Sequence, residues 1–322
     1  MTQRGTLVAW GRSLRLSLLP TAMADGLAGF AIAGLSEFPK DERLFLFASS
    51  ACIYHGAMAL NDWADREKDA IDRPDRPIPS GELQSGHVLL LASVLISIGL
   101  GLAFSLDQRL FAWMSAIAAT AVTYDLWLRG PVIGPLCLGA CRAMHMAAPI
   151  AWLAPDRLQT FWYLPVGYGL YVFTLSRLAR LEEQSAALLG SKPKRLIYLQ
   201  ALSFTLPLLA AAIMSEATFR SSLESLAANN VVMPWPATLS PQWPLTLLAL
   251  SGAFVLIRRS IGSEEWTPAR VQASVGTALR LLLIYSAACA FTGDGTYRFV
   301  AIALILLGYP IAHSLRKVFP PT

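Results

Sequence analysis

Ten long apolar stretches, separated by short polar segments, run through the 322-residue sequence. A helix of about 20 apolar residues crosses a bilayer core about 30 Å thick. Only 15% of the residues are charged, whereas soluble proteins carry about 25%. The pattern therefore predicts an all-α, polytopic membrane helical bundle and excludes a soluble, secreted or disordered protein. The stretches begin near Leu14, Leu44, His87, Leu110, Gly134, Phe161, Leu196, Trp243, Val271 and Tyr297.

The stretches near Leu110 and Trp243 are short, so the sequence predicts nine or ten transmembrane helices. Lys and Arg gather in alternate connections, on the same side as the N-terminus, and such connections are usually cytoplasmic. We therefore expect both termini and the polar loops to be cytoplasmic, in a bacterial-type inner (plasma) membrane. No repeat or large insertion interrupts the pattern, which indicates a single integral-membrane domain over residues 1–322. The net charge of +5 is scattered rather than patched, so no nucleic-acid partner is expected.

A dense run of charge follows the second apolar stretch and reads N-D-W-A-D-R-E-K-D. On a continuing helix, Asp62, Asp65 and Asp69 stand at i, i+3 and i+7 and share one face, with Asn61 within reach of Asp65. Like charges clustered in this way repel each other. Mg²⁺ prefers oxygen ligands and is commonly shared between carboxylates and substrate phosphates, so these aspartates are candidate metal ligands.

Two arginines, Arg73 and Arg76, come next, where Pro74, Pro77 and Pro79 must end the helix. Arginine can bind phosphate oxygens through two parallel hydrogen bonds. Metal-binding carboxylates beside such arginines suit a diphosphate. The alternative is a solvated loop whose charges only mark the membrane topology and cap the helix.

This segment resembles the first signature of the UbiA superfamily of intramembrane prenyltransferases, because it reads N-D-x-x-D-x-x-x-D followed by D-R-P-x-R-P-I-P-S-G. The resemblance implies a UbiA-like fold and Mg²⁺-dependent transfer of an isoprenyl group from an isoprenyl diphosphate donor to a hydrophobic acceptor. It implies that the metal and diphosphate are held by Asn61, Asp62, Asp65 and Asp69, with Arg73 and Arg76 near the phosphates.

A second segment resembles the family's Y-[ST]-x-x-L-K-R motif and the arginine of its fifth span less closely. Its matching residues are Tyr124, Leu128, Arg129, Gly134, Gly139 and Arg142, whereas Asp125, Gly130 and Pro135 depart from the pattern. The resemblance makes Tyr124, Arg129 and Arg142 candidate substrate-binding residues. An arginine within a span is unfavourable unless it is functional or paired, and pairing with Asp25 or a backbone carbonyl is the structural alternative for Arg142.

The family's second aspartate motif is missing from the segment Thr174 to Gln184, which contains no aspartate. Arg177 and Arg180 stand there at i and i+3 and share a face. In one interpretation they neutralise the leaving diphosphate, helped by Lys192, Lys194 or Arg195. In the other, the protein is a non-catalytic lipid-phosphate-binding or transport-associated membrane protein. The arginine-rich segment more narrowly resembles the UbiA-like member of the bacterial ebo gene cluster.

The sequence thus predicts a Mg²⁺-dependent prenyltransferase whose partners are an isoprenyl diphosphate, an unidentified hydrophobic acceptor and membrane lipids. We expect the catalytic residues to be Asp62, Asp65, Asp69, Arg73 and Arg177. We expect the substrate-binding residues to be Asn61, Arg76, Tyr124, Arg129, Arg142, Arg180 and Lys192. Neither the prenyl chain length nor the acceptor follows from these residues.

Overall fold

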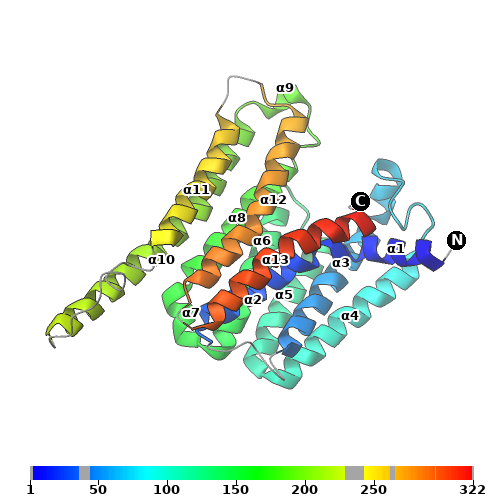
Figure 1. Ribbon diagram of the computed structural model, residues 1–322. Helices are drawn as coiled ribbons and strands as arrows, with labels where there is room; N and C mark the ends of the chain where they lie inside the picture. Colours follow the sequence, from blue (N-terminus) through cyan, green and yellow to red (C-terminus); the bar gives the residue numbers. More distant parts are fainter. Residues whose placement is uncertain (1–2, 36–43, 229–242, 262–264, 294, 321–322) are drawn as a thin grey trace.

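A computed structural model of the chain describes residues 3–35, 44–228, 243–261, 265–293 and 295–320 (Figure 1). Every regular element within these ranges is a helix, which confirms the predicted all-α class. The elements are α1 (Gln3–Ser13), η1 (Leu16–Leu18, a 3-10 helix), α2 (Leu19–Ile32), α3 (Leu44–Asp72), α4 (Ser85–Leu106), α5 (Gln108–Leu126), α6 (Ile133–Leu153), α7 (Pro155–Phe161), α8 (Tyr163–Ala179), α9 (Ala186–Leu189), α10 (Lys192–Ala228), α11 (Trp243–Ser260), α12 (Pro268–Phe291) and α13 (Tyr297–Val318).

Each predicted apolar stretch corresponds to a helix that begins within a few residues of the expected position. Among the described residues, six helices are long and apolar enough to cross a membrane: α3, α4, α6, α12, α13 and the Lys192–Met214 part of α10. Shorter apolar helical segments cover Leu16–Ile32 and Thr246–Arg258. The chain is an integral membrane protein, and the number of nine or ten spans stays a prediction.

Helix α3 carries the acidic residues and stays helical up to Asp72, just before the first proline, as predicted. The connection to α4 is folded into turns by its own backbone. The amide of Ser80 donates to the carbonyl of Arg76 at 2.9 Å, and that of Leu83 donates to Pro77 at 2.8 Å. This loop therefore holds Arg76 close to the end of α3.

Small residues let neighbouring helices approach closely, as is usual in membrane bundles. A Cβ atom on Gly139 of α6 would lie 2.5 Å from the carbonyl oxygen of Gly169 in α8, and one on Gly169 would lie 2.8 Å from that of Gly139. Between α3 and α4, the Ser49 hydroxyl donates to the carbonyl of Gly99 at 2.6 Å. These contacts fix the helices that surround the bundle interior.

Helix α2 lies at the middle of the bundle, against α6, α12 and α13 (Figure 1). Beside it, aromatic rings join α8, α10 and α12: the Tyr285 ring centroid lies 5.3 Å from Tyr168, 5.8 Å from Tyr171 and 4.9 Å from Phe204.

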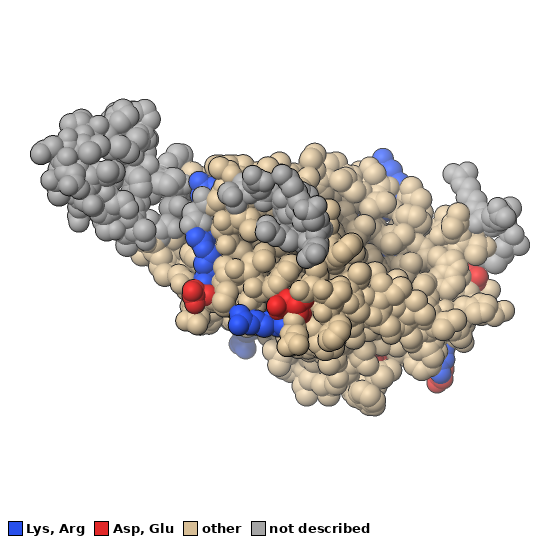
Figure 2. All heavy atoms as spheres, turned by 90° about the horizontal axis from the view of Figure 1, so that it is seen from below, with Lys and Arg blue, Asp and Glu red and all other residues tan. Residues whose placement is uncertain are grey.

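The outer helix faces of the bundle are apolar. The face turned downward in Figure 1 shows few charged side chains among its described atoms (Figure 2). Apolar outer faces with few charged side chains suit a bundle surrounded by lipid.

Candidate active site

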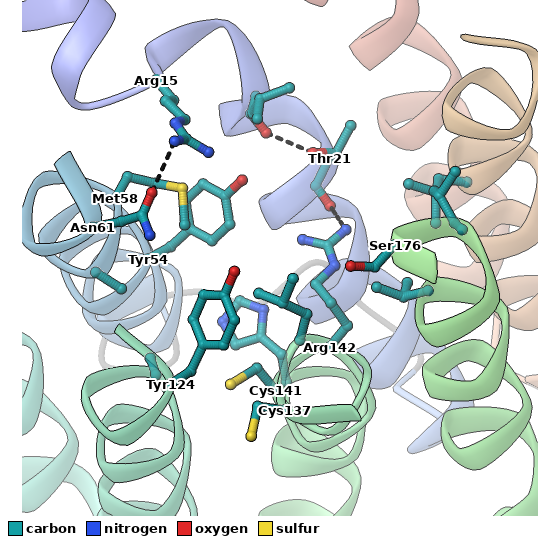
Figure 3. Close-up of a pocket in the computed structure, with 18 of the residues that line it drawn as sticks. Arg15, Thr21, Tyr54, Met58, Asn61, Tyr124, Cys137, Cys141, Arg142 and Ser176 are labelled. Atoms are coloured by element: carbon teal, nitrogen blue, oxygen red, sulfur yellow. Dashed lines mark hydrogen bonds between the residues drawn. The ribbon is translucent and has the colours of Figure 1, made fainter. Parts of the chain in front are cut away.

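A cavity of about 440 Å³ lies inside the bundle, between α2, α3, α5, α6, α8 and α12. Most of its lining is apolar or small, including Ile53, Ala57, Leu138 and Leu282. Its lining also contains the charged, amide or imidazole side chains of Arg15, Asn61, Asp125, Arg142, His145 and Arg316, and the phenol groups of Tyr54 and Tyr124. Figure 3 shows the side chains of several of these residues turned toward the open space. The cavity therefore combines a long apolar wall with a few charged groups.

The cavity extends from the acidic end of α3 into the bundle. Helix α3 contributes lining residues from Ser50 to Asn61, a rise of roughly 16 Å at about 1.5 Å per residue. Asn61 directly precedes the first of the predicted aspartates. One end of the cavity is thus next to the charged cluster, and the rest lies among apolar side chains.

Asn61 is held from two sides at that charged end. Arg15 donates to its Oδ1 atom at 3.0 Å, and its Nδ2 atom donates to Asp125 Oδ1 at 2.9 Å (Figure 3 shows the first contact). The backbone of Arg15 is left-handed, with φ 51° and ψ 46°, a conformation that is uncommon outside glycine. This turn between α1 and η1 places the guanidinium beside α3.

Four of the charged or imidazole side chains in the lining, those of Arg15, Asp125, His145 and Arg316, are not site residues in the sequence-based prediction. In the sequence, Arg15 lies at the start of the first apolar stretch and Arg316 lies at the end of the last one, so both are interpreted as charges that only mark the membrane topology. The one available signal was Asp125, where a carboxylate replaces the small hydroxyl residue of the family motif. A buried carboxylate is unusual enough to mark a site.

The predicted aspartates each lie beside an arginine. Arg76 contacts Asp69 at 2.6 Å and lies 3.7 Å from Asp62, so these two carboxylates share a helix face, as predicted. Asp62 also lies 3.6 Å from Arg15. The side chain of Asp65 turns to another partner, Arg129 of the α5–α6 connection. Arginines thus lie beside all three carboxylates that the sequence assigns to a metal, but they donate hydrogen bonds only to Asp65 and Asp69.

Asp62 has free capacity for a cation. Its side chain is 3% exposed, and neither carboxylate oxygen accepts a hydrogen bond within the described part of the chain. Buried oxygens without such partners are unfavourable, and a cation would satisfy them. Carboxylate and amide oxygens are the donors that Mg²⁺ takes. The donor set fits Mg²⁺ chemically, although no three His, Cys, Asp or Glu side chains in the described ranges converge into a metal-binding group.

Three of the other predicted arginines, Arg73, Arg177 and Arg180, lie outside the cavity lining. Arg177 donates to the carbonyl of Pro131 at 2.5 Å, and Arg180 donates to those of Arg129 and Gly130 at 3.1 and 3.2 Å. Both therefore hold the α5–α6 connection. Arg73 pairs with Glu183 at 3.3 Å. The first residue of α10, Lys192, is exposed and also lies outside the lining.

Arg142 lines the cavity and is also part of a buried network. Its Nε atom lies 3.1 Å from Asp25 Oδ2, and it donates to the Tyr168 hydroxyl and the Thr21 carbonyl, both at 2.9 Å. The Tyr168 hydroxyl in turn donates to Asp25 Oδ1 at 2.8 Å. The expected structural partners, Asp25 and a backbone carbonyl, are thus both present. Tyr124 also lines the cavity, and its substrate-binding role stays a prediction.

The geometry agrees with a comparison with known proteins, in which the model of the UbiA prenyltransferase family matches residues 18–273. The chain belongs to the UbiA prenyltransferase family. This membership makes it a transferase that acts on isoprenyl groups in the membrane, as the signature around Asp62 predicted.

Among curated relatives, digeranylgeranylglyceryl phosphate synthase of Methanopyrus kandleri is 26% identical over 247 residues, covering 72% of this chain and 82% of that protein. Its namesake from Methanospirillum hungatei is 40% identical over 84 residues, or 26% of this chain and 30% of that protein. Chlorophyll synthase of Arabidopsis thaliana is 42% identical over 64 residues, or 20% of this chain and 16% of that protein. The two relatives with the higher identities are thus matched over less than a third of their own length.

Solved structures of the family share the fold. A UbiA homolog from Archaeoglobus fulgidus superimposes with a TM-score of 0.60 at 14% identity, covering 92% of this chain and 99% of that chain. The same homolog bound to DMAPP and Mg²⁺ gives a TM-score of 0.56 at 14% identity, covering 91% and 99%. The helical arrangement of this chain is therefore that of the UbiA family.

Proposed function

We propose that the protein transfers an isoprenyl group from an allylic polyprenyl diphosphate to a lipid-soluble acceptor, in a Mg²⁺-dependent reaction within the membrane. One observation carries the proposal: a cavity that begins beside Asn61 and Asp62 and continues between apolar helix faces. A polyprenyl diphosphate has the same division into a charged head and an apolar chain.

The charged end provides the groups that a diphosphate requires. Mg²⁺ would be held by Asp62 and Asp69, with Asn61 and Asp65 as the other predicted ligands, and it would stabilise negative charge on the leaving diphosphate. Arg76 already joins Asp62 to Asp69, so its guanidinium is placed to donate to phosphate oxygens. A structure of a family member bound to DMAPP and Mg²⁺ supports the choice of a diphosphate and Mg²⁺ as the two ligands.

Arg73, Arg177, Arg180 and Lys192 belong to the same proposal as a second layer of positive charge. Arg177 and Arg180 hold the connection that carries Arg129, the partner of Asp65. They would thus set the position of an ion pair beside the diphosphate. Basic residues of this kind stabilise charge that develops on the leaving group.

The apolar wall gives the isoprenyl chain a site away from water. Closed, apolar surroundings protect a reactive allylic cation from hydrolysis. Tyr54 and Tyr124 line this part of the cavity, and aromatic faces attract cations. The excess of Lys and Arg beside both termini supports a cytoplasmic position for the charged end, in a bacterial-type inner membrane.

The test is diphosphate release from geranyl, farnesyl and geranylgeranyl diphosphates by purified protein, with and without Mg²⁺, in the presence of a lipid extract of the source cells. We expect Mg²⁺-dependent release. Asp62→Asn should lower it by roughly 100-fold or more, the order found when one group that stabilises developing charge is removed. Asp72→Asn is the matched control, because Asp72 ends the same helix but is exposed and 3.9 Å from Lys68.

Equal release by the two variants, or release that does not depend on Mg²⁺, would contradict the proposed mechanism. Tight donor binding without release would support the non-catalytic lipid-phosphate-binding alternative. Both variants should elute as wild-type protein does in size-exclusion chromatography, so that a loss of release reports chemistry rather than unfolding.

A further inference from the structure

Asp125 is the one carboxylate among the residues of the described chain that line the cavity. It lies in the last turn of α5 and is 3% exposed. The signature aspartates Asp62, Asp65 and Asp69 lie beside the cavity rather than in its lining. A buried carboxylate in an otherwise largely apolar wall needs a partner or a function.

The contacts of Asp125 leave part of the carboxylate available. Its Oδ1 atom accepts a hydrogen bond from Asn61 at 2.9 Å, and Asn61 is itself fixed by Arg15. No hydrogen bond to its Oδ2 atom is present among the described residues. The arrangement therefore orients a carboxylate whose second oxygen can still accept a proton.

The position of Asp125 matches that of the reacting carbon. In an allylic diphosphate this carbon is bonded directly to a diphosphate oxygen, so it must lie where the charged end of the cavity meets the apolar wall. Asn61 marks this boundary, because it lines the cavity and directly precedes Asp62. Asp125 is hydrogen-bonded to Asn61 and thus lies at the same boundary.

We infer that Asp125 is the general base of the transfer and that the acceptor presents a neutral hydroxyl group. This inference rests on the proposed function. The bond between the allylic carbon and the diphosphate oxygen breaks, and its electron pair leaves with the diphosphate. A lone pair of the acceptor oxygen forms the new carbon–oxygen bond, and the hydroxyl proton passes to Asp125, which makes the product an ether.

A carboxylate acceptor fits this position poorly. It has no proton to lose at neutral pH, so Asp125 would have none to accept from it. A hydroxyl group instead donates a hydrogen bond to the carboxylate before it reacts. The site thus favours an acceptor whose reacting group carries a proton that Asp125 can accept.

The experiment separates donor ionisation from transfer. Ionisation is followed without any acceptor, as exchange of ¹⁸O between the bridging and non-bridging positions of geranylgeranyl diphosphate. Transfer is followed with deuterated geranylgeranyl diphosphate and the lipid extract, and mass spectrometry locates the label. We expect an alkali-stable ether. Asp125→Asn should lower transfer by about 100-fold or more and leave isotope exchange within a few-fold of wild type.

Asp107→Asn is the control, since Asp107 caps the opposite end of α5, where it accepts from the backbone amides of Arg109 and Leu110, and should change neither rate. An alkali-labile ester product, or unchanged transfer by Asp125→Asn, would overturn the inference and leave the proposed function standing. An equal fall of exchange and transfer would assign Asp125 to ionisation or folding and overturn its role as a base. Failure of wild-type protein in both assays would overturn both proposals.

Discussion

The acidic end of α3 and the centre of the bundle both hold aspartate–arginine pairs, but the pairs differ in how completely they are closed. In the centre, Asp25 is fully buried and its Oδ1 atom accepts a hydrogen bond from Tyr168 at 2.8 Å. Its Oδ2 atom accepts no hydrogen bond from the described residues but lies 3.1 Å from Arg142 Nε, so each oxygen has a close partner. At the end of α3, Asp62 lies 3.6 Å and 3.7 Å from two arginines and accepts no hydrogen bond from any described residue.

This difference separates a structural network from one suited to a ligand. A closed network has little capacity for a new partner, and its groups would lose contacts if a substrate displaced them. An incomplete network gains contacts when a cation or a phosphate enters it. The same two residue types thus serve stability in one region and, in the proposed function, chemistry in the other.

The largest effect is expected from breaking the central pair. Asp25→Asn leaves the Arg142 charge uncompensated within the bundle and should destabilise the protein by about 3–5 kcal/mol, measured as thermal unfolding in detergent. Asp25→Leu combined with Arg142→Met should recover much of this loss, because an apolar pair can replace a buried ion pair. Wild-type unfolding of Asp25→Asn would show that the network does not stabilise the fold.

A smaller effect is expected at the end of α3. Arg76→Gln removes the contact with Asp69, in which both side chains are less than 10% exposed, and should destabilise the protein by about 1.5–3 kcal/mol. Chemical unfolding of the variant beside Arg66→Gln, which leaves this pair intact, measures the difference. A loss as large as that of Asp25→Asn would remove the distinction between the two regions.

The smallest effect is expected at the surface. Glu183→Gln breaks the pair with Arg73, in which the side chains are 67% and 49% exposed. Exposed pairs contribute at most about 1 kcal/mol, and salt screens them. Unfolding of the variant should match wild type at high ionic strength, and a difference that persists in salt would show a role beyond this ion pair.

The sequence predicts the helices well because the length of each apolar stretch can be read directly from the sequence and compared with the thickness of the bilayer. Helix α3 also ends as expected, since its last residue, Asp72, lies two positions before Pro74, the first residue of the proline segment. The short α1 was not predicted as a separate element, because the turn at Arg15 depends on a left-handed backbone rather than on a glycine or proline. Local patterns therefore predict most of the fold but not this turn.

The site is less predictable, since its partners come from distant segments. Periodicity correctly places Asp62 and Asp69 on one face, but it suggests Asp65 as a neighbour of Asn61. Asn61 instead bonds to Arg15 and Asp125, and Asp65 pairs with a residue of the α5–α6 connection. Only the packing of the bundle decides these contacts.

The cavity is completed by residues near both ends of the sequence, since Arg15 precedes η1 and Arg316 lies in α13. Helix α13 reaches this place by packing against α2 and η1. A ribosome adds about 5–20 residues per second, so the two arginines are synthesised roughly 15–60 s apart. A nascent chain thus enters the membrane without the complete cavity and acquires it only after its C-terminal helix is inserted.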